Sequence, residues 1–98
     1  RVPMNTLADY NLQEELDEFY RGNESRYRKY WESWKRRKLR TKRINRILQV
    51  KRRILPSIKE KGQHLPILLD KHNNIQDGTH RVSAMKVLGY KSVLAGYI

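Results

Sequence analysis

The spacing of apolar residues changes along this 98-residue chain, and the change predicts two kinds of structure. In residues 8–61 apolar side chains recur every three or four positions, which is typical of amphipathic helices. In residues 62–98 they form short runs separated by turn residues, which favours strands around one further helix. We therefore expect one domain, residues 1–98, of the α/β (α+β) class, with helices on a small mixed sheet.

The first half of the chain begins with an alternating stretch, residues 1–7, that predicts a short strand with Pro3 at an edge or near its start. Residues 8–24 predict an acidic helix that ends near Gly22, with Ser25 as the N-cap of the next helix. Residues 25–53 form either one long helix or two helices that meet near residues 39–42. Two are favoured, because polar residues interrupt the apolar face there.

In the second half, Pro56 should push Leu55 out of the helical region, so a short helix is expected over Ser57–Lys61. A buried strand over residues 64–69, an Asn-containing turn at residues 71–74 and a return strand at residues 75–76 come after it. A helix that ends at Gly89 is next. Residues 92–98 then predict a last strand, central in the sheet and covered.

Aromatic residues mark one face of the helix that starts after Ser25. They are Tyr27, Tyr30, Trp31 and Trp34, at positions i, i+3, i+4 and i+7. Aromatics between basic residues can stack on nucleobases. At helical spacing, however, they more often form the buried face, so a role in the core or in an interface is favoured.

The net charge of +12 comes from one segment of the chain. Residues 26–53 hold 14 Lys or Arg and a single acid, whereas the remainder is close to neutral. The positive electrostatic field of this segment favours a polyanionic partner: a nucleic acid, an acidic membrane surface or a highly phosphorylated ligand. The candidate nucleic-acid-binding residues are Arg36, Arg37, Lys38, Arg40, Lys42 and Arg43.

The chain contains no cysteine, which excludes disulfides, thiolate nucleophiles and cysteine-based zinc sites. This composition fits a reducing compartment, and we expect a cytoplasmic protein. No apolar run approaches the roughly 20 residues that a transmembrane helix needs, so no transmembrane segment is expected.

Residues 77–81 place a glycine, a hydroxyl, an imidazole and a guanidinium where a strand is expected to turn into a helix. The first N–H groups of a helix lack intrahelical partners and carry the positive end of the helix dipole, so this turn is a candidate phosphate cradle. The structural alternative is simpler: Asp77 closes an Asx-turn, Thr79 caps the helix and Arg81 pairs with a nearby acid.

Several stretches in order resemble the ParB/sulfiredoxin superfamily. They are residues 55–62 (LPSIKEKG), 65–68 (LPIL), 77–84 (DGTHRVSA) and 88–93 (LGYKSV), with residues 2–7 (VPMNTL) similar to the family's first strand. The resemblance covers about residues 1–10 and 54–98. Residues 11–53 would then be an acidic-then-basic helical insertion. In this superfamily the turn holds nucleotide phosphates.

The resemblance also limits the reactions that this chain is expected to catalyse. Sulfiredoxin has its nucleophilic Cys where this chain has Thr79, which excludes sulfinic-acid reduction. The partition proteins usually carry an acidic residue after the glycine, so this chain departs from them as well. The D-G-x-H-R pattern is closest to the free serine kinases of the superfamily, which implies binding of ATP or CTP with Mg²⁺ and phosphoryl transfer or hydrolysis. The alternative is a DNA- or RNA-binding module.

The roles that the resemblance implies are specific. Gly78, Thr79, His80 and Arg81 would bind the phosphates. His80 would also act as an acid or base near neutral pH, and Asp77 would bind Mg²⁺ or orient His80. Gln63 and His64 could face the same pocket. The candidates for a carboxylate base are Glu14, Glu15, Asp17 and Glu18.

Overall fold

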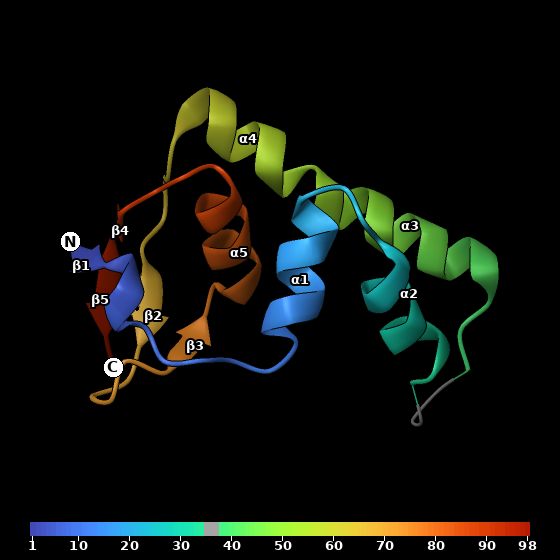
Figure 1. The fold of residues 1–98 in the computed structure, drawn as a ribbon, viewed down its shortest axis with the longest axis horizontal. Coiled ribbons are helices and arrows are strands. Elements are labelled where there is room, and N and C mark those ends of the chain that lie inside the picture. The colour runs from blue at the N-terminus through green and yellow to red at the C-terminus, as the bar shows by residue number, and fades with distance from the viewer. Residues whose placement is uncertain (35–37) are drawn as a thin grey trace.

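The computed structural model describes residues 1–34 and 38–98, which form a small mixed α+β fold (Figure 1). The helices are α1 (Gln13–Tyr20), α2 (Ser25–Glu32), α3 (Thr41–Arg52), α4 (Ile54–Lys61) and α5 (Thr79–Val87). The strands are β1 (Val2–Pro3), β2 (Ile67–Leu69), β3 (Ile75–Asp77), β4 (Ser92–Val93) and β5 (Ala95–Tyr97). The α+β class that the apolar pattern predicts is therefore confirmed.

The strands form two small sheets. β2 pairs with β3 in the antiparallel direction and with β5 in the parallel direction, and β1 pairs with β4. The turn between β2 and β3 contains Asn73 at φ 62°, as the sequence predicts. The expected last strand is divided at Leu94, whose carbonyl accepts a hydrogen bond from the Ile67 N–H (3.0 Å).

Two predictions about the strands were wrong. The final strand, β5, lies at an edge of its sheet, because the turn after β2 brings β3 back against the other side of β2 and leaves β2 in the centre. The first strand ends at Pro3, because a 3₁₀ turn over Met4–Thr6 comes directly after it, and the Thr6 hydroxyl donates to the Pro3 carbonyl (2.7 Å).

The helices of residues 11–53 share one core with the strands. Leu16 and Phe19 of α1, Tyr27 of α2 and Leu48 of α3 are each at most 2% exposed, and they belong to the same buried cluster as Ile67 of β2. In Figure 1, α5 lies between the strands and α1, and α3 and α4 run along one side of the molecule. Residues 11–53, which the family resemblance would make an insertion, therefore belong to the same folding unit as the strands.

The interpretation of the aromatic residues as a buried face is confirmed. Tyr27 is 1% exposed, Tyr30 and Trp31 pack against the core, and the rings of Tyr27 and Trp31 meet edge to face with centroids 6.1 Å apart. Aromatic pairs favour this geometry. These side chains hold α2 against α1 and α5.

Helix boundaries agree in part with the sequence. Separate α2 and α3 helices confirm the two-helix interpretation, and Gly22, Gly62 and Gly89 come after helix ends with positive φ. Ser25, however, is the first residue of α2, and its N–H donates to the Asn23 side-chain oxygen (3.2 Å).

The α4 helix begins earlier than predicted, at Ile54, with Leu55 and Pro56 in its first turn. Proline is tolerated there because the first N–H groups of a helix have no intrahelical acceptor. Only Arg53 separates α3 from α4, so the two helices run almost end to end. Among the helices described, none has the length and apolar character that a membrane span requires.

Candidate functional site

The turn between β3 and α5 depends on a glycine. Gly78 has φ 109°, and a Cβ atom at this position would lie 2.7 Å from Ile67 Cγ2. Ile67 belongs to β2 and is fully buried, so it has little room to move. Only glycine combines this backbone conformation with so close an approach. The turn at Gly78 thus packs directly against the central strand.

Arg81 is bound to the segment that leads into β2. Its Nη1 donates to the carbonyls of Leu65 (3.0 Å) and Pro66 (3.3 Å), and its Nη2 lies 3.3 Å from Asp77 Oδ2. The Asp77 side chain is 69% exposed, so this ion pair adds little to stability. The pairing that the structural alternative predicted for Arg81 is present.

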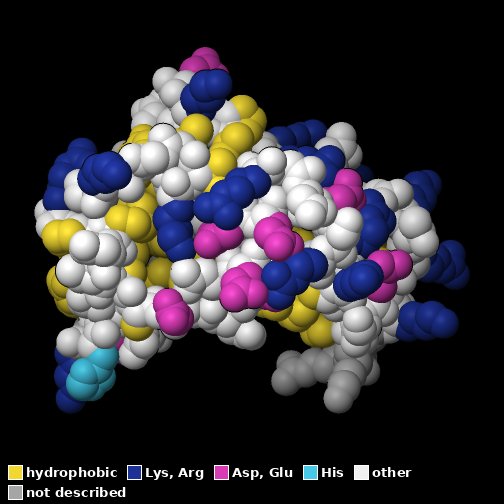
Figure 2. Space-filling model, viewed as in Figure 1, with side chains coloured by type: hydrophobic (Ala, Val, Ile, Leu, Met, Phe, Trp, Pro, Cys, Tyr) yellow, Lys and Arg dark blue, Asp and Glu magenta, His cyan; other side chains and the backbone are white. Residues whose placement is uncertain are grey.

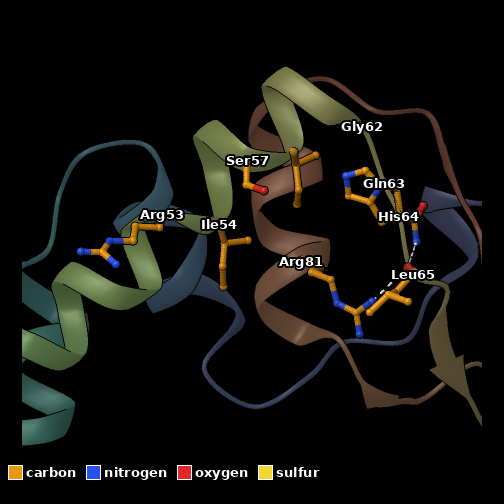
Figure 3. Close-up of a pocket in the computed structure, with 9 residues that line it drawn as sticks. Arg53, Ile54, Ser57, Gly62, Gln63, His64, Leu65 and Arg81 are labelled. Atoms are coloured by element: carbon orange, nitrogen blue, oxygen red, sulfur yellow. Dashed lines mark hydrogen bonds between the residues drawn. The ribbon is translucent and has the colours of Figure 1, made fainter.

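A cavity of about 370 Å³ opens beside Arg81, between α4 and the segment after it (Figure 3). Its lining combines two cations, a hydroxyl and an imidazole with apolar side chains: Arg53, Ile54, Ser57, Ile58, Gly62, Gln63, His64, Leu65 and Arg81. Among these lining residues there is no carboxylate. Cations and hydroxyl donors beside an apolar wall form a suitable environment for a phosphorylated ligand with an apolar or aromatic part.

Gln63 and His64 both line this cavity, as the sequence suggested. The Gln63 side chain also connects two segments of backbone. Its amide nitrogen donates to the carbonyls of Leu65 (3.0 Å) and Leu94 (2.9 Å), and its amide oxygen accepts from the Leu94 N–H (2.8 Å). Gln63 therefore shapes the cavity wall, which leaves His64 as the more exposed of the two.

His80 lies away from the cavity. Its Nδ1 is 3.1 Å from the Tyr20 hydroxyl and its Nε2 is 3.4 Å from the Tyr27 hydroxyl. The Tyr20 hydroxyl donates its single proton to the Lys51 carbonyl (3.1 Å), so the Nδ1–H of His80 donates to Tyr20 and Nε2 accepts from Tyr27. The imidazole joins α5 to α1 and α2.

The protonation of His80 depends on this environment. Burial, with a further contribution from the positive charge of Lys51, lowers the pKa of His80 to about 4. The side chain is therefore neutral at pH 7. The predicted roles of His80 as a phosphate ligand and as an acid or base near neutral pH do not agree with this placement. Successive residues of a helix point about 100° apart, so Arg81 and His80 leave α5 in different directions.

The carboxylates proposed as a base are engaged elsewhere. Arg26 contacts Glu14 (3.1 Å), Glu15 (2.9 Å) and Glu18 (3.3 Å), and Lys86 contacts Asp17 (3.2 Å). In Figure 2 acidic and basic side chains alternate over α1. These acids form ion pairs from α1 to α2 and α5, and none of them lines the Arg81 cavity.

The predicted Mg²⁺ ligand, Asp77, offers one exposed carboxylate that is already paired with Arg81. Within residues 1–34 and 38–98 there is no group of three or more His, Asp or Glu side chains that could hold a metal ion. An ion held by Asp77 would therefore depend on phosphate oxygens and water for most of its coordination.

The four predicted nucleic-acid-binding residues that the structure describes lie close together. Lys38, Arg40, Lys42 and Arg43 line a shallow hollow of about 470 Å³ with Leu39 and Arg46. Arg36 and Arg37 lie outside the described residues. Arg46 was not predicted for this surface, and Arg53 and Ser57 were not predicted for the cavity. The i, i+4 spacing of Arg53 and Ser57, which places them on one helix face, is the signal that could have found them.

Gly78 and Thr79 lie at the start of α5, but neither lines the Arg81 cavity, and no side chain caps this helix end, so the expected cap by Thr79 is absent. Comparisons of the chain with protein-family models, with curated proteins and with solved structures found no match.

Proposed function

We propose that this protein binds a nucleoside triphosphate, ATP or CTP, in the cavity beside Arg81. The observation that carries the proposal is the cavity itself, because Arg81 of the D-G-x-H-R turn lines it together with Ser57 and His64, and Arg53 lies at its edge with its guanidinium pointing away from the other three (Figure 3). A volume of about 370 Å³ falls within the range of small-molecule sites. The resemblance of residues 54–98 to the ParB/sulfiredoxin superfamily supports the same assignment.

Each part of the cavity has a place in this proposal. Arg53 and Arg81 would supply positive charge for the phosphates, and Arg81, whose Nη1 already donates to two carbonyls, would act mainly through its charge. Ser57 adds a hydroxyl donor. Ile54, Ile58 and Leu65 provide the apolar surface against which a base or ribose can pack. The N-terminal turn of α5, which contains Arg81, would add partial positive charge.

Magnesium and phosphoryl transfer are the second part of the proposal. Bound Mg²⁺ would neutralise charge on the phosphates, and Asp77, the ion-pair partner of Arg81, would be a carboxylate ligand for it. Positioning and charge neutralisation supply most of the catalysis in phosphoryl transfer. Among the described residues of the cavity wall, His64 is the side chain that could accept a proton, so it replaces His80 as the candidate base.

The test is a thermal-shift and calorimetric titration with ATP, CTP and inorganic triphosphate, with and without Mg²⁺. Each variant is compared with its own ligand-free melting temperature. Arg53→Ala removes a cation at the edge of the cavity that makes no described ion pair, and Lys59→Ala removes an exposed cation of α4 outside the cavity. We expect Arg53→Ala to weaken binding at least tenfold and Lys59→Ala to leave it unchanged.

Two results would contradict the proposal. One is the absence of a shift with any nucleotide at millimolar concentration. The other is equal weakening by Arg53→Ala and Lys59→Ala, which would indicate general attraction of anions to a basic protein rather than a site. Arg81→Ala is a poorer variant, because it also removes two hydrogen bonds to the segment before β2.

A further inference from the structure

Two groups of described basic residues in the helical segment differ in their partners. The first group neutralises acids: Arg26 contacts three glutamates of α1, and Arg28 and Arg52 both lie 2.6 Å from Glu24. These ion pairs fasten α2 to α1 and to α3. Their charges are therefore already compensated within the fold.

The second group lies along α3 and the residues that precede it. We call it the α3 basic face: Lys38, Arg40, Lys42, Arg43, Arg46 and Lys51. In residues 1–34 and 38–98 none of its members forms an ion pair within the chain, since every ion pair in these ranges involves other cations. Five of its members line the 470 Å³ hollow, and a second hollow of about 250 Å³ continues from Arg43 and Arg46 to Lys51.

One face of α3 packs against the protein core, and the opposite face is exposed. Ile44 and Leu48 are 2% exposed and anchor it to the core, whereas Lys42, Arg43 and Arg46 are exposed. The exposed amide side chains of Asn45 and Gln49 lie on the same helix. Its 12 residues span about 18 Å at 1.5 Å per residue. In Figure 2, Lys and Arg side chains project from the α2–α3 end of the molecule.

We propose that the α3 basic face binds double-stranded DNA, with α3 lying along a groove. The major groove is about 12 Å wide and admits one α-helix, and its phosphates flank the helix on both sides. The unpaired cations would neutralise these phosphates, which provides affinity independent of sequence. Asn45 and Gln49 carry amide groups of the kind that contact adenine edges.

The placement of apolar side chains favours nucleic acid over an acidic membrane. A helix that lies on a membrane inserts a stripe of large apolar side chains between the lipids. The apolar stripe of α3 is buried in the protein core instead. Among the large hydrophobic residues that are exposed in the described chain, only Val50 (49% exposed) belongs to α3.

The experiment is fluorescence anisotropy with a labelled 20-base-pair duplex, titrated at several salt concentrations. The test variant is Arg43→Gln/Arg46→Gln. The control is Lys59→Gln/Lys61→Gln, which removes the same charge from exposed positions of α4 outside both hollows and outside the Arg81 cavity. Circular dichroism and melting temperatures establish that both variants remain folded. Vesicles of phosphatidylcholine with phosphatidylserine, and polyglutamate, serve as the alternative polyanions.

We expect the test variant to bind the duplex at least tenfold more weakly than the control at the same salt concentration. The slope of log K against log salt should fall by about two units, because two phosphates are no longer neutralised. The proposal is overturned if both variants lose affinity equally, if binding does not depend on salt, or if the vesicles or polyglutamate bind as tightly as the duplex.

Discussion

The Nδ1 atom of His80 lies 3.1 Å from the hydroxyl of Tyr20, although 60 positions separate the two residues in the sequence. Because of this hydrogen bond, the imidazole of the D-G-x-H-R turn lies outside the candidate nucleotide site and connects α5 to α1. The residues of the motif therefore have different roles: Arg81 borders the cavity, Gly78 allows the close turn, and His80 stabilises the packing of the helices.

The first prediction concerns pH. The pKa of His80 is about 4 in the folded protein and 6.5 in the unfolded chain, so the unfolded chain binds the extra proton between these values. The contribution of His80 to stability is complete above about pH 6.5 and is lost as the pH falls towards 4. The loss should be on the order of 2–3 kcal/mol, given about 1.4 kcal/mol for each pKa unit.

Urea unfolding between pH 4 and 7.5 measures this effect. The variant His80→Gln should unfold with a weaker pH dependence than the wild type. Identical profiles for His80→Gln and the wild type would show that other groups determine the acid sensitivity.

The second prediction concerns the turn before α5. Gly78→Ala should destabilise the protein by roughly 2–4 kcal/mol, because the new methyl group would meet Ile67 as well as force a strained φ. Gly22→Ala is a matched control, since Gly22 has φ 107° and no atom within 4 Å of the added Cβ. It should cost only the backbone strain, about 1 kcal/mol. Equal costs for the two variants in urea unfolding would rule out the Ile67 contact.

The third prediction concerns the helical segment of residues 11–53. Leu48→Ala should destabilise the whole domain by roughly 2–5 kcal/mol, because Leu48 is 2% exposed in the shared core. Val50→Ala, at a half-exposed position of the same helix, should cost less than about 1 kcal/mol. The fluorescence of Trp31 and Trp34 and the far-UV circular dichroism should report one transition. Two separated transitions would mean that the segment unfolds independently.

The fourth prediction concerns the two proposed ligands. The Arg81 cavity and the hollow of the α3 basic face share no lining residue. A substitution in one of them should therefore weaken the binding of its own ligand and leave the binding of the other ligand unchanged. Arg43→Gln/Arg46→Gln should keep the nucleotide affinity of the wild type, measured by calorimetry. Ser57→Ala should weaken nucleotide binding by several-fold and leave duplex binding unchanged. If the arginine substitutions abolished nucleotide binding, the two ligands would share one site.

Much of the fold is determined by local sequence. The separation of α2 from α3, the helix ends at Gly62 and Gly89, and the turn at Asn73 depend on residues within a few positions of one another. Backbone preferences and apolar periodicity act at this range, so they can be read from the chain. The boundary at Pro56 was misjudged because a proline in the first turn of a helix is tolerated.

The sequence by itself determined the α+β class, the glycine turn and the concentration of positive charge in residues 26–53. Tertiary structure alone decided that His80 turns towards Tyr20 and Tyr27, that Arg53 and Ser57 join Arg81 at one cavity, and that β5 lies at an edge. It also decided which cations the acids of α1 and Glu24 neutralise. These outcomes depend on which helix covers each face of α5 and α3, and such packing joins residues that are distant in the chain.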